Sequence, residues 1–323
     1  DREALAALLK PLVWWAWHAL RYEVGDWAHE ALAVQPEPAY ARAVANHLFT
    51  HGGRPEDAIR LVEELGGEVD AGDPDAECLW AWAHFNARIL TADPGLMSWM
   101  HRWVEAAQRT GSVAHAAAVR SIEVVFRVRL GEMDEARRVG VEAWQEARST
   151  GNQIAMCWAA FMKGRAFSDS DPRLALEHFD QAAEIAQRVG LPLNGGFAAT
   201  EAAVVIARLA EPGEARERLA PALRSFIDSG DRQQLWTSAH HFAYYLTRVG
   251  RSEDARCIWR ELGGRQGWAA RHHRDELAEL LGDPGDGSLS DDQLVESIRG
   301  VLDTLDLESP HSADRRTARG EST

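Results

Sequence analysis

Residues 131–151 read GEMDEARRVGVEAWQEARSTG, and the pattern of this stretch returns along the chain at a nearly constant spacing. Its closing glycine, Gly151, has counterparts at Gly111, Gly190 and Gly230, with steps of 40, 39 and 40 residues. An alanine one turn into the stretch keeps the same spacing. The equivalent alanines are Ala136, Ala175, Ala215 and Ala255. Self-similarity at a fixed period of about 20–50 residues is typical of solenoid proteins.

Each repeat is predicted to form two helices. Apolar residues recur at helical spacing, as in Ala175, Phe179, Ala182 and Ala186, and no alternating strand pattern competes with them. Prolines fall where the second helix of a unit begins, and the repeated glycines fall where a left-handed residue ends it. These prolines are Pro55, Pro94, Pro172 and Pro212. We therefore expect an all-α superhelix, a solenoid of about seven helix pairs. The pairs are expected at 5–35, 38–66, 74–110, 112–150, 152–189, 192–229 and 231–263.

The segment after the last pair is predicted to cap the solenoid, because an end repeat otherwise exposes its stacking face. We expect a helix near 268–281, a turn at 282–287 and a helix opening with the capping box Ser290-Asp-Asp-Gln293. That helix carries one apolar stripe, made of Leu294, Ile298, Val301, Leu302 and Leu305. The solenoid with its capping helices is thus assigned to residues 1–306. Residues 307–323 contain few apolar side chains and are predicted to be a disordered tail.

Composition excludes several classes of protein. The chain has 323 residues, 46% of them hydrophobic and 26% charged, which supplies a large core. Its formal charge of -15 disfavours nucleic acid and anionic lipid as partners, and no apolar run is long enough to cross a membrane. The three cysteines are widely separated, which favours a reducing, cytoplasmic compartment.

The repeated unit, with small residues where its two helices pack, resembles the tetratricopeptide repeat (TPR). Most units here are near 40 residues, whereas a TPR unit has about 34. The fold that this resemblance implies is a TPR-like solenoid.

Three segments extend the resemblance. They are ALRYEVGDWAHEAL at 19–32, LWTSAHHFAYYLTRVGR at 235–251 and GSLSDDQLV at 287–295. Together they resemble the C-terminal repeat region of large actinobacterial signal-transduction ATPases of the STAND type. In that family an NB-ARC-like nucleotide switch is often joined to a LuxR-type, SARP-type or adenylate-cyclase output domain, and the repeats act as the sensor. The resemblance implies a role in signal transduction or transcription regulation.

The chain lacks the phosphate-binding loop of such an ATPase. No GxxxxGK[ST] motif is present, and the lysines Lys10 and Lys163 precede Pro11 and Gly164 without the required glycine spacing. The resemblance therefore implies the sensor part, whose partner is the nucleotide-binding domain of its own parent chain.

Catalytic and metal-binding patterns are weak. His47 and His51 lie four residues apart, but Leu48 stands where a metalloprotease motif needs glutamate. The polar cluster of His272, His273, Asp275 and Glu276 is better explained as a solvated helix face. No GxSxG motif is present. We expect no enzymatic activity, no metal and no cofactor.

The first helix of each pair is expected to line the inner face, where solenoids bind their partners. With Ala28 taken as the equivalent alanine of the first unit, four of the units carry an arginine seven residues before the repeated alanine. These are Arg21, Arg129, Arg208 and Arg248. One explanation is structural, since cations at a helix end offset its dipole and meet the acidic residues that open the next helix.

The other explanation is a binding patch towards the C-terminal half of the inner face. The residues assigned to it are Thr200, Arg208, Thr237, His240, Tyr244 and Arg248. Their helical spacing places the last four on one face, and in so acidic a protein the arginines form a local positive patch. Such a patch favours a protein or peptide segment or a small anionic ligand.

The sequence thus favours a non-catalytic sensor or protein-interaction solenoid of a cytoplasmic ATPase. The alternative is a free-standing TPR adaptor, such as a receptor for chaperone tails. That function needs lysine and asparagine carboxylate clamps, and the chain has only two lysines.

Overall fold

The computed structural model describes residues 23–34, 73–89, 95–209, 211–263, 271–284 and 290–307, with isolated positions between 4 and 21, between 57 and 61, and at 265. In this described part every regular element is an α-helix, and no strand occurs. The helices are α2 (Glu23–Val34), α5 (Pro74–Ile89), α6 (Leu96–Arg109), α7 (Val113–Leu130), α8 (Met133–Thr150), α9 (Gln153–Phe167), α10 (Pro172–Val189), α11 (Pro192–Arg208), α12 (Pro212–Ser229), α13 (Arg232–Arg248), α14 (Ser252–Leu262), α15 (Arg271–Leu281) and α16 (Asp291–Leu307).

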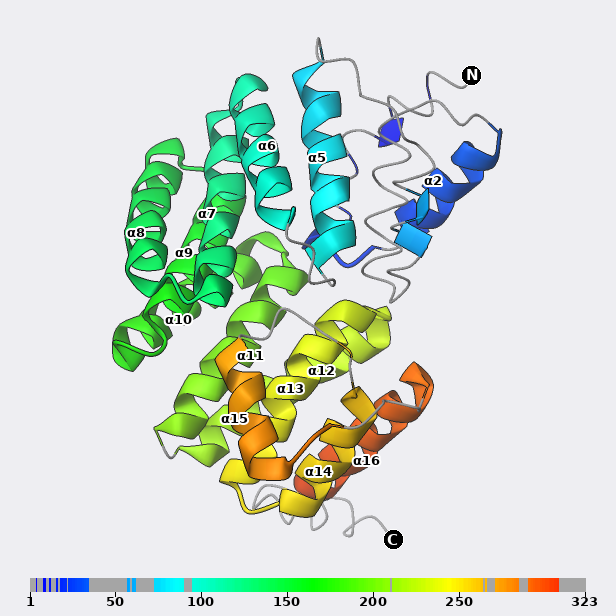
Figure 1. The fold of residues 1–323 in the computed structure, drawn as a ribbon, viewed down its shortest axis with the longest axis vertical. Helices are drawn as coiled ribbons and strands as arrows, with labels where there is room; N and C mark the ends of the chain where they lie inside the picture. The colour runs from blue at the N-terminus through cyan, green and yellow to red at the C-terminus, as the bar shows by residue number, and fades with distance from the viewer. Residues whose placement is uncertain are drawn as a thin grey trace, which may run out of the picture.

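Helices α5 to α14 form five consecutive pairs and confirm the helical-repeat fold (Figure 1). Each predicted pair from 74–110 to 231–263 coincides with two observed helices. Helix α2 lies within the predicted pair at 5–35. Most of the pair at 38–66, including His47 and His51, and the tail from 308 to 323 lie outside the described residues.

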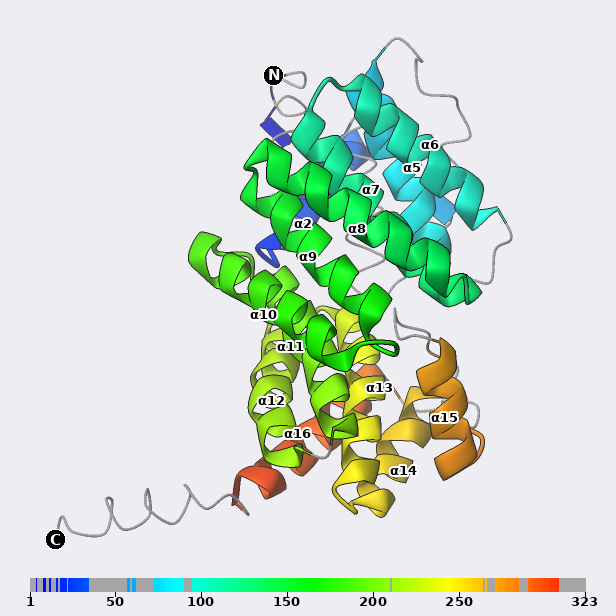
Figure 2. The same cartoon turned by 90° about the vertical axis from the view of Figure 1, so that its left-hand side faces the viewer.

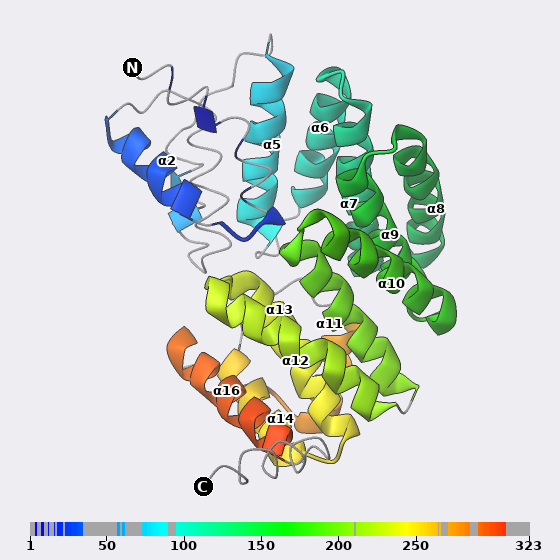
Figure 3. The same ribbon diagram turned by 180° about the vertical axis from the view of Figure 1, so that it is seen from behind.

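The pairs stack in chain order (Figures 2 and 3). The two helices of a pair pack together, and each second helix also packs on the first helix of the next pair, as α10 does on α11. First helices of neighbouring pairs touch as well: α7 packs on α9, and α11 on α13. From α7 through α9 and α11 to α13, the first helices therefore form a continuous layer, which we call the inner face.

Where the structure describes them, the repeated glycines and prolines act as the sequence predicts; Pro55 and Pro94 lie outside the described residues. Gly151, Gly190 and Gly230 end α8, α10 and α12 with φ of 65°, 73° and 72°, in the left-handed region that favours glycine. Pro172 and Pro212 are the first residues of α10 and α12, where no helical N–H is needed.

The repeated alanines pack where the helices of a pair approach each other. Ala136, Ala175, Ala215 and Ala255 are all fully buried. Glycine permits a still closer approach at Gly164, where an added Cβ would lie 2.6 Å from Cε1 of Phe179. Small residues thus allow the two helices of a pair to approach closely.

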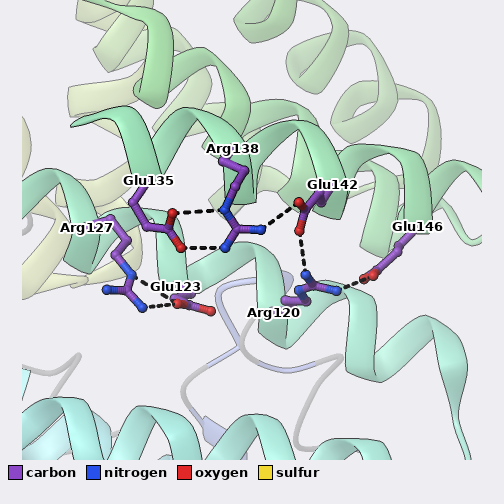
Figure 4. A network of polar contacts seen from close by, with 7 residues as sticks. All are labelled: Arg120, Glu123, Arg127, Glu135, Arg138, Glu142 and Glu146. Carbon is purple, nitrogen blue, oxygen red and sulfur yellow. Dashed lines mark hydrogen bonds and ion pairs between the residues drawn. The ribbon is translucent and has the colours of Figure 1, made fainter. Parts of the chain in front are cut away.

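Ion pairs join the two helices of one pair across their exposed surface (Figure 4). Arg120 on α7 contacts Glu142 at 2.8 Å and also pairs with Glu146, while Arg138 bridges from Glu142, at 2.6 Å, to Glu135. Exposed ion pairs contribute about 0.2–1 kcal/mol each, so burial of the apolar stripes remains the main source of stability.

Helix α16 closes the C-terminal end of the stack. The predicted capping box is present: the backbone N–H of Ser290 donates to Oε1 of Gln293 at 2.8 Å, and the N–H of Gln293 donates to Oγ of Ser290 at 3.3 Å. The stripe of Leu294, Ile298 and Leu302 is buried against α14 and α12. Helix α16 thus covers the last pair, in the place where the sequence predicts a cap.

None of the described helices is both long and apolar enough to cross a bilayer.

Candidate functional site

The six residues of the predicted patch lie on two neighbouring helices of the inner face. Helix α11 carries Thr200 and Arg208, and helix α13, which packs on it, carries the other four. Thr200, Thr237, His240 and Tyr244 are buried, Arg208 is half-buried, and Arg248 is exposed. The patch therefore has an inner, buried part and an outer part formed by the two arginines.

The buried part is bonded to its own helices. The hydroxyl of Thr200 donates to the carbonyl of Phe197 at 3.1 Å, and that of Thr237 donates to the carbonyl of Gln233 at 3.0 Å. Nδ1 of His240 lies 2.7 Å from the carbonyl oxygen of Trp236, which makes Nδ1 the protonated nitrogen. Burial lowers the pKa of His240 to about 3, so the ring is neutral at physiological pH.

Arg208 is held on three sides. Its Nη1 donates to Oδ1 of Asp169 at 2.7 Å, and its guanidinium carbon lies 5.8 Å from the ring centre of Tyr244. Burial acts to lower the pKa of Arg208, but the hydrogen bonds and charges of Asp169 and Tyr244 together outweigh it and hold that pKa above its ordinary value. Two carboxylates, those of Asp169 and Glu276, offset the charge of Arg208. The expected positive patch is thus reduced on this side.

The structure places α15 over the predicted patch. Oε2 of Glu276 lies 3.9 Å from Nη2 of Arg208. Leu277 is fully buried, and α15 packs on α13 and α14 (Figures 1 and 2). Burial and the charge of Glu276 raise the pKa of Tyr244, against the effect of Arg208. Glu276 therefore faces the patch, whereas the sequence pattern favoured a solvated face for its cluster.

A cavity of about 290 Å³ opens where α11, α12, α13 and α15 meet. Its walls are Ala207, Pro212, Thr247, Arg248 and Leu280. Within the described part of the chain, the guanidinium of Arg248 forms no ion pair or hydrogen bond. An exposed cation thus stands beside largely apolar walls, an arrangement suited to a group that is part anionic and part apolar.

The arginines at equivalent repeat positions have different surroundings. Arg21 pairs with Glu23, which opens the next helix, as the structural explanation requires. Arg208 instead reaches Asp169, and Arg248 faces the cavity. The side chain of Arg129 lies outside the described residues. A helix-end role accounts for Arg21 and leaves Arg248 as the arginine most available to a partner.

Sequence reasoning missed a buried polar cluster beside the patch. Nη1 of Arg165 lies 3.1 Å from Oε1 of Glu201, and Nε2 of His241 lies 3.9 Å from the same oxygen, with all three side chains less than 9% exposed. Seven residues before Glu201 and His241 stand Asn194 and Gln234, whose buried side-chain amides have no hydrogen-bond partner within the described part of the chain. Unpaired buried polar groups cost about 1–3 kcal/mol each, so this polar part of the core lowers the stability of the fold.

The repeat register could have revealed this cluster. Fourteen residues before the repeated alanine, the fourth and fifth units carry Ile122 and Phe161, whereas the next two units carry Glu201 and His241. A core position that changes from apolar to ionisable in two neighbouring units marks a specialised region of the inner face.

Among the described residues, no group of three or more His, Cys, Asp or Glu side chains could hold a metal ion.

No protein-family model and no curated protein matches the chain. Among solved structures, the chain is similar to a signal transduction ATPase with numerous domains (STAND) with a tetratricopeptide repeat sensor from Pyrococcus horikoshii, at 15% identity and a TM-score of 0.48. The similarity covers 97% of this chain and 49% of that chain, so this chain spans about half of that protein's length.

Proposed function

We propose that the chain is a non-catalytic sensor and interaction solenoid that binds a protein segment or a small anionic ligand on its inner face. The observation that carries this proposal is the position of Arg248, exposed at the edge of an apolar cavity between α11, α13 and α15. A guanidinium beside apolar walls binds a carboxylate or phosphate through charge-assisted hydrogen bonds while an apolar group fills the cavity.

The parent protein, in this proposal, is a cytoplasmic STAND-type ATPase, and the solenoid regulates its nucleotide-binding domain. Two features support this assignment. One of the three segments that resemble the actinobacterial sensor regions covers most of α13, which carries four of the six patch residues. Cys78, Cys157 and Cys257 are free thiols, as in reducing compartments. A Walker motif immediately upstream in the reading frame is the expected finding. A native start codon near Asp1 would favour the free-standing adaptor instead.

Binding is tested with two probes, a fluorescein-labelled acidic amphipathic peptide and inorganic phosphate, on wild-type protein and on Arg248→Gln. Arg256→Gln is the matched control, because Arg256 lies on α14 and pairs with Glu253. Loss of a charge-assisted hydrogen bond predicts about tenfold weaker binding of at least one probe, with the melting temperature kept.

A structural role for Arg248 would give the opposite result. The melting temperature would fall while both probes bound as they do to the wild type, and this outcome would remove the patch from the proposed function. The same pair of readings applied to Arg208→Gln separates its contact with Asp169 from any contact with the probe.

A further inference from the structure

Helix α15 lies on the inner face, at the place where a partner is expected, and carries the acidic side chains of Asp275, Glu276 and Glu279 beside Arg271 and Arg274. It presents Glu276 to Arg208 and inserts Leu277 into the core, so that a carboxylate and an apolar side chain are set one residue apart. These are the two kinds of contact that the patch offers to a partner. The chain thus supplies its own occupant for this surface.

The hold on α15 is weak for a helix of the stack. Leu277 is its only fully buried side chain among those described, whereas α13 buries most of its side chains. Leu280 is 51% exposed although it lines the cavity, and the contact between Arg208 and Glu276 is long, at 3.9 Å. The cavity beside Leu280 shows that α15 leaves part of the surface unfilled.

The residues flanking α15 are anchored independently of it. Before it, Nε of Arg265 donates to Oδ1 of Asp291 at 3.0 Å, and after it, α16 is fixed by the same Asp291, which accepts from Nε1 of Trp236 at 3.1 Å. Arg224 adds a contact with Asp306 at 2.6 Å. None of these contacts involves α15, so the anchoring of the C-terminal cap does not depend on that helix. Directly after α15, Nε1 of Trp259 also donates to the carbonyl of Gly282 at 2.8 Å, which fixes the end of the helix to α14.

We propose that α15 is a displaceable internal ligand, and that the partner of this surface is an acidic amphipathic helix that takes its place. Such a helix sets a carboxylate against Arg208 and a second one against Arg248, with an apolar side chain in the cavity. This inference rests on the proposed function, which it deepens by naming the class of partner. A helix lying in a groove with apolar and charged anchors is an established mode of peptide recognition.

The experiment uses a fluorescein-labelled peptide of residues 266–284, in its native sequence, and measures its binding to the full chain by anisotropy. In the Glu276→Arg chain, α15 presents a positive charge to Arg208 and therefore competes poorly with the added peptide for the surface. The native peptide is expected to bind this variant at least about tenfold more tightly than it binds the wild type. Glu279→Arg is the control, because Glu279 is exposed on the same helix. The affinity of this variant for the labelled peptide is expected to stay within about twofold of that of the wild type.

Hydrogen exchange of the wild-type chain is the second measurement and needs no variant. Amides of α15 are expected to exchange at least about 100-fold faster than those of α13 and α16, because α15 opens alone. Exchange of α15 as slow as that of α13, or equal peptide affinity for the wild type and Glu276→Arg, would overturn the inference. Either result concerns α15 only, whereas the proposed function is judged by the effect of Arg248→Gln.

Inorganic phosphate separates the two kinds of partner. If the partner is a helix, the peptide is expected to stay bound to the Glu276→Arg chain when phosphate is added at millimolar concentration. Displacement of the peptide by phosphate would show that the surface recognises only the anion, and would contradict the helical partner.

Discussion

At the scale of single residues, two glycines determine how closely neighbouring helices pack. An added Cβ at Gly164 would lie 2.6 Å from Phe179, and one at Gly196 would lie 2.4 Å from Cζ of Phe226. Both aromatic rings are fully buried, so they have no free space into which to move. The glycines are therefore part of the core.

Gly196→Ala is expected to lower the free energy of unfolding by about 1–3 kcal/mol, because the methyl group must displace Phe226. Gly195→Ala is the matched control. Its Cβ would lie 3.5 Å from that of Ala186, an ordinary contact, so the better helix propensity of alanine should dominate and leave stability equal or slightly higher. Urea unfolding followed by circular dichroism measures both. Equal destabilisation by the two changes would show that Phe226 does not fill this space.

His240 makes stability depend on pH. Its folded pKa of about 3 lies below the ordinary value of 6.5, so between these values the unfolded chain binds a proton that the folded chain does not. Stability contributed by His240 is therefore fully present above pH 6.5 and is lost as the pH falls towards 3, by about 1.4 kcal/mol per pH unit. Arg274 and His241 act in the same direction.

The measurement is urea unfolding between pH 7 and pH 4 for wild type, His240→Gln and the exposed control His101→Gln. The slope of unfolding free energy against pH is expected to become shallower in His240→Gln and to remain unchanged in His101→Gln. A residual slope is expected from His84 and His115, whose pKa values burial lowers to about 3 and about 4. An unchanged slope in His240→Gln would mean that the ring is accessible to protons in the folded state.

At the scale of elements, α16 covers the last helix pair. Ile298 is fully buried in its apolar stripe, next to the half-buried Val301. Ile298→Ala is expected to cost about 2–5 kcal/mol, and Val301→Ala clearly less. Since repeats are coupled mainly to their neighbours, hydrogen exchange in Ile298→Ala should speed up in α12 to α14 and change little in α7 and α8. Uniform acceleration along the chain would contradict a solenoid of locally coupled pairs.

The elements show what could be predicted from the sequence. Helix pairs, glycine caps and the Ser290 capping box depend on nearby residues, and their patterns are visible in a single chain. The position of α15 depends on where a terminal helix folds back, which no local pattern specifies. For the same reason the inner-face location of Thr237 and His240 is predictable from helical spacing, whereas their complete burial is not.

At the scale of the whole molecule, the inner face changes character along the stack. Its register positions are apolar at Ile122 and Phe161, and they are occupied by the ionisable side chains of Glu201 and His241 where α9, α11 and α13 meet. The cavity, the exposed Arg248 and the covering helix α15 all lie at this polar end. The architecture of stacked pairs thus provides a uniform scaffold on which one end of the inner face is specialised.

The most direct test of this account is hydrogen exchange of the full chain with and without a saturating acidic amphipathic peptide. With the peptide bound, protection of backbone amides is expected to be confined to α11 and α13 around Arg208 and Arg248. Amides of α15 are expected to exchange faster, because that helix is displaced. Protection of the second helices α12 and α14 alone, with α15 unchanged, would contradict it, because the partner would then bind the outer side of the solenoid.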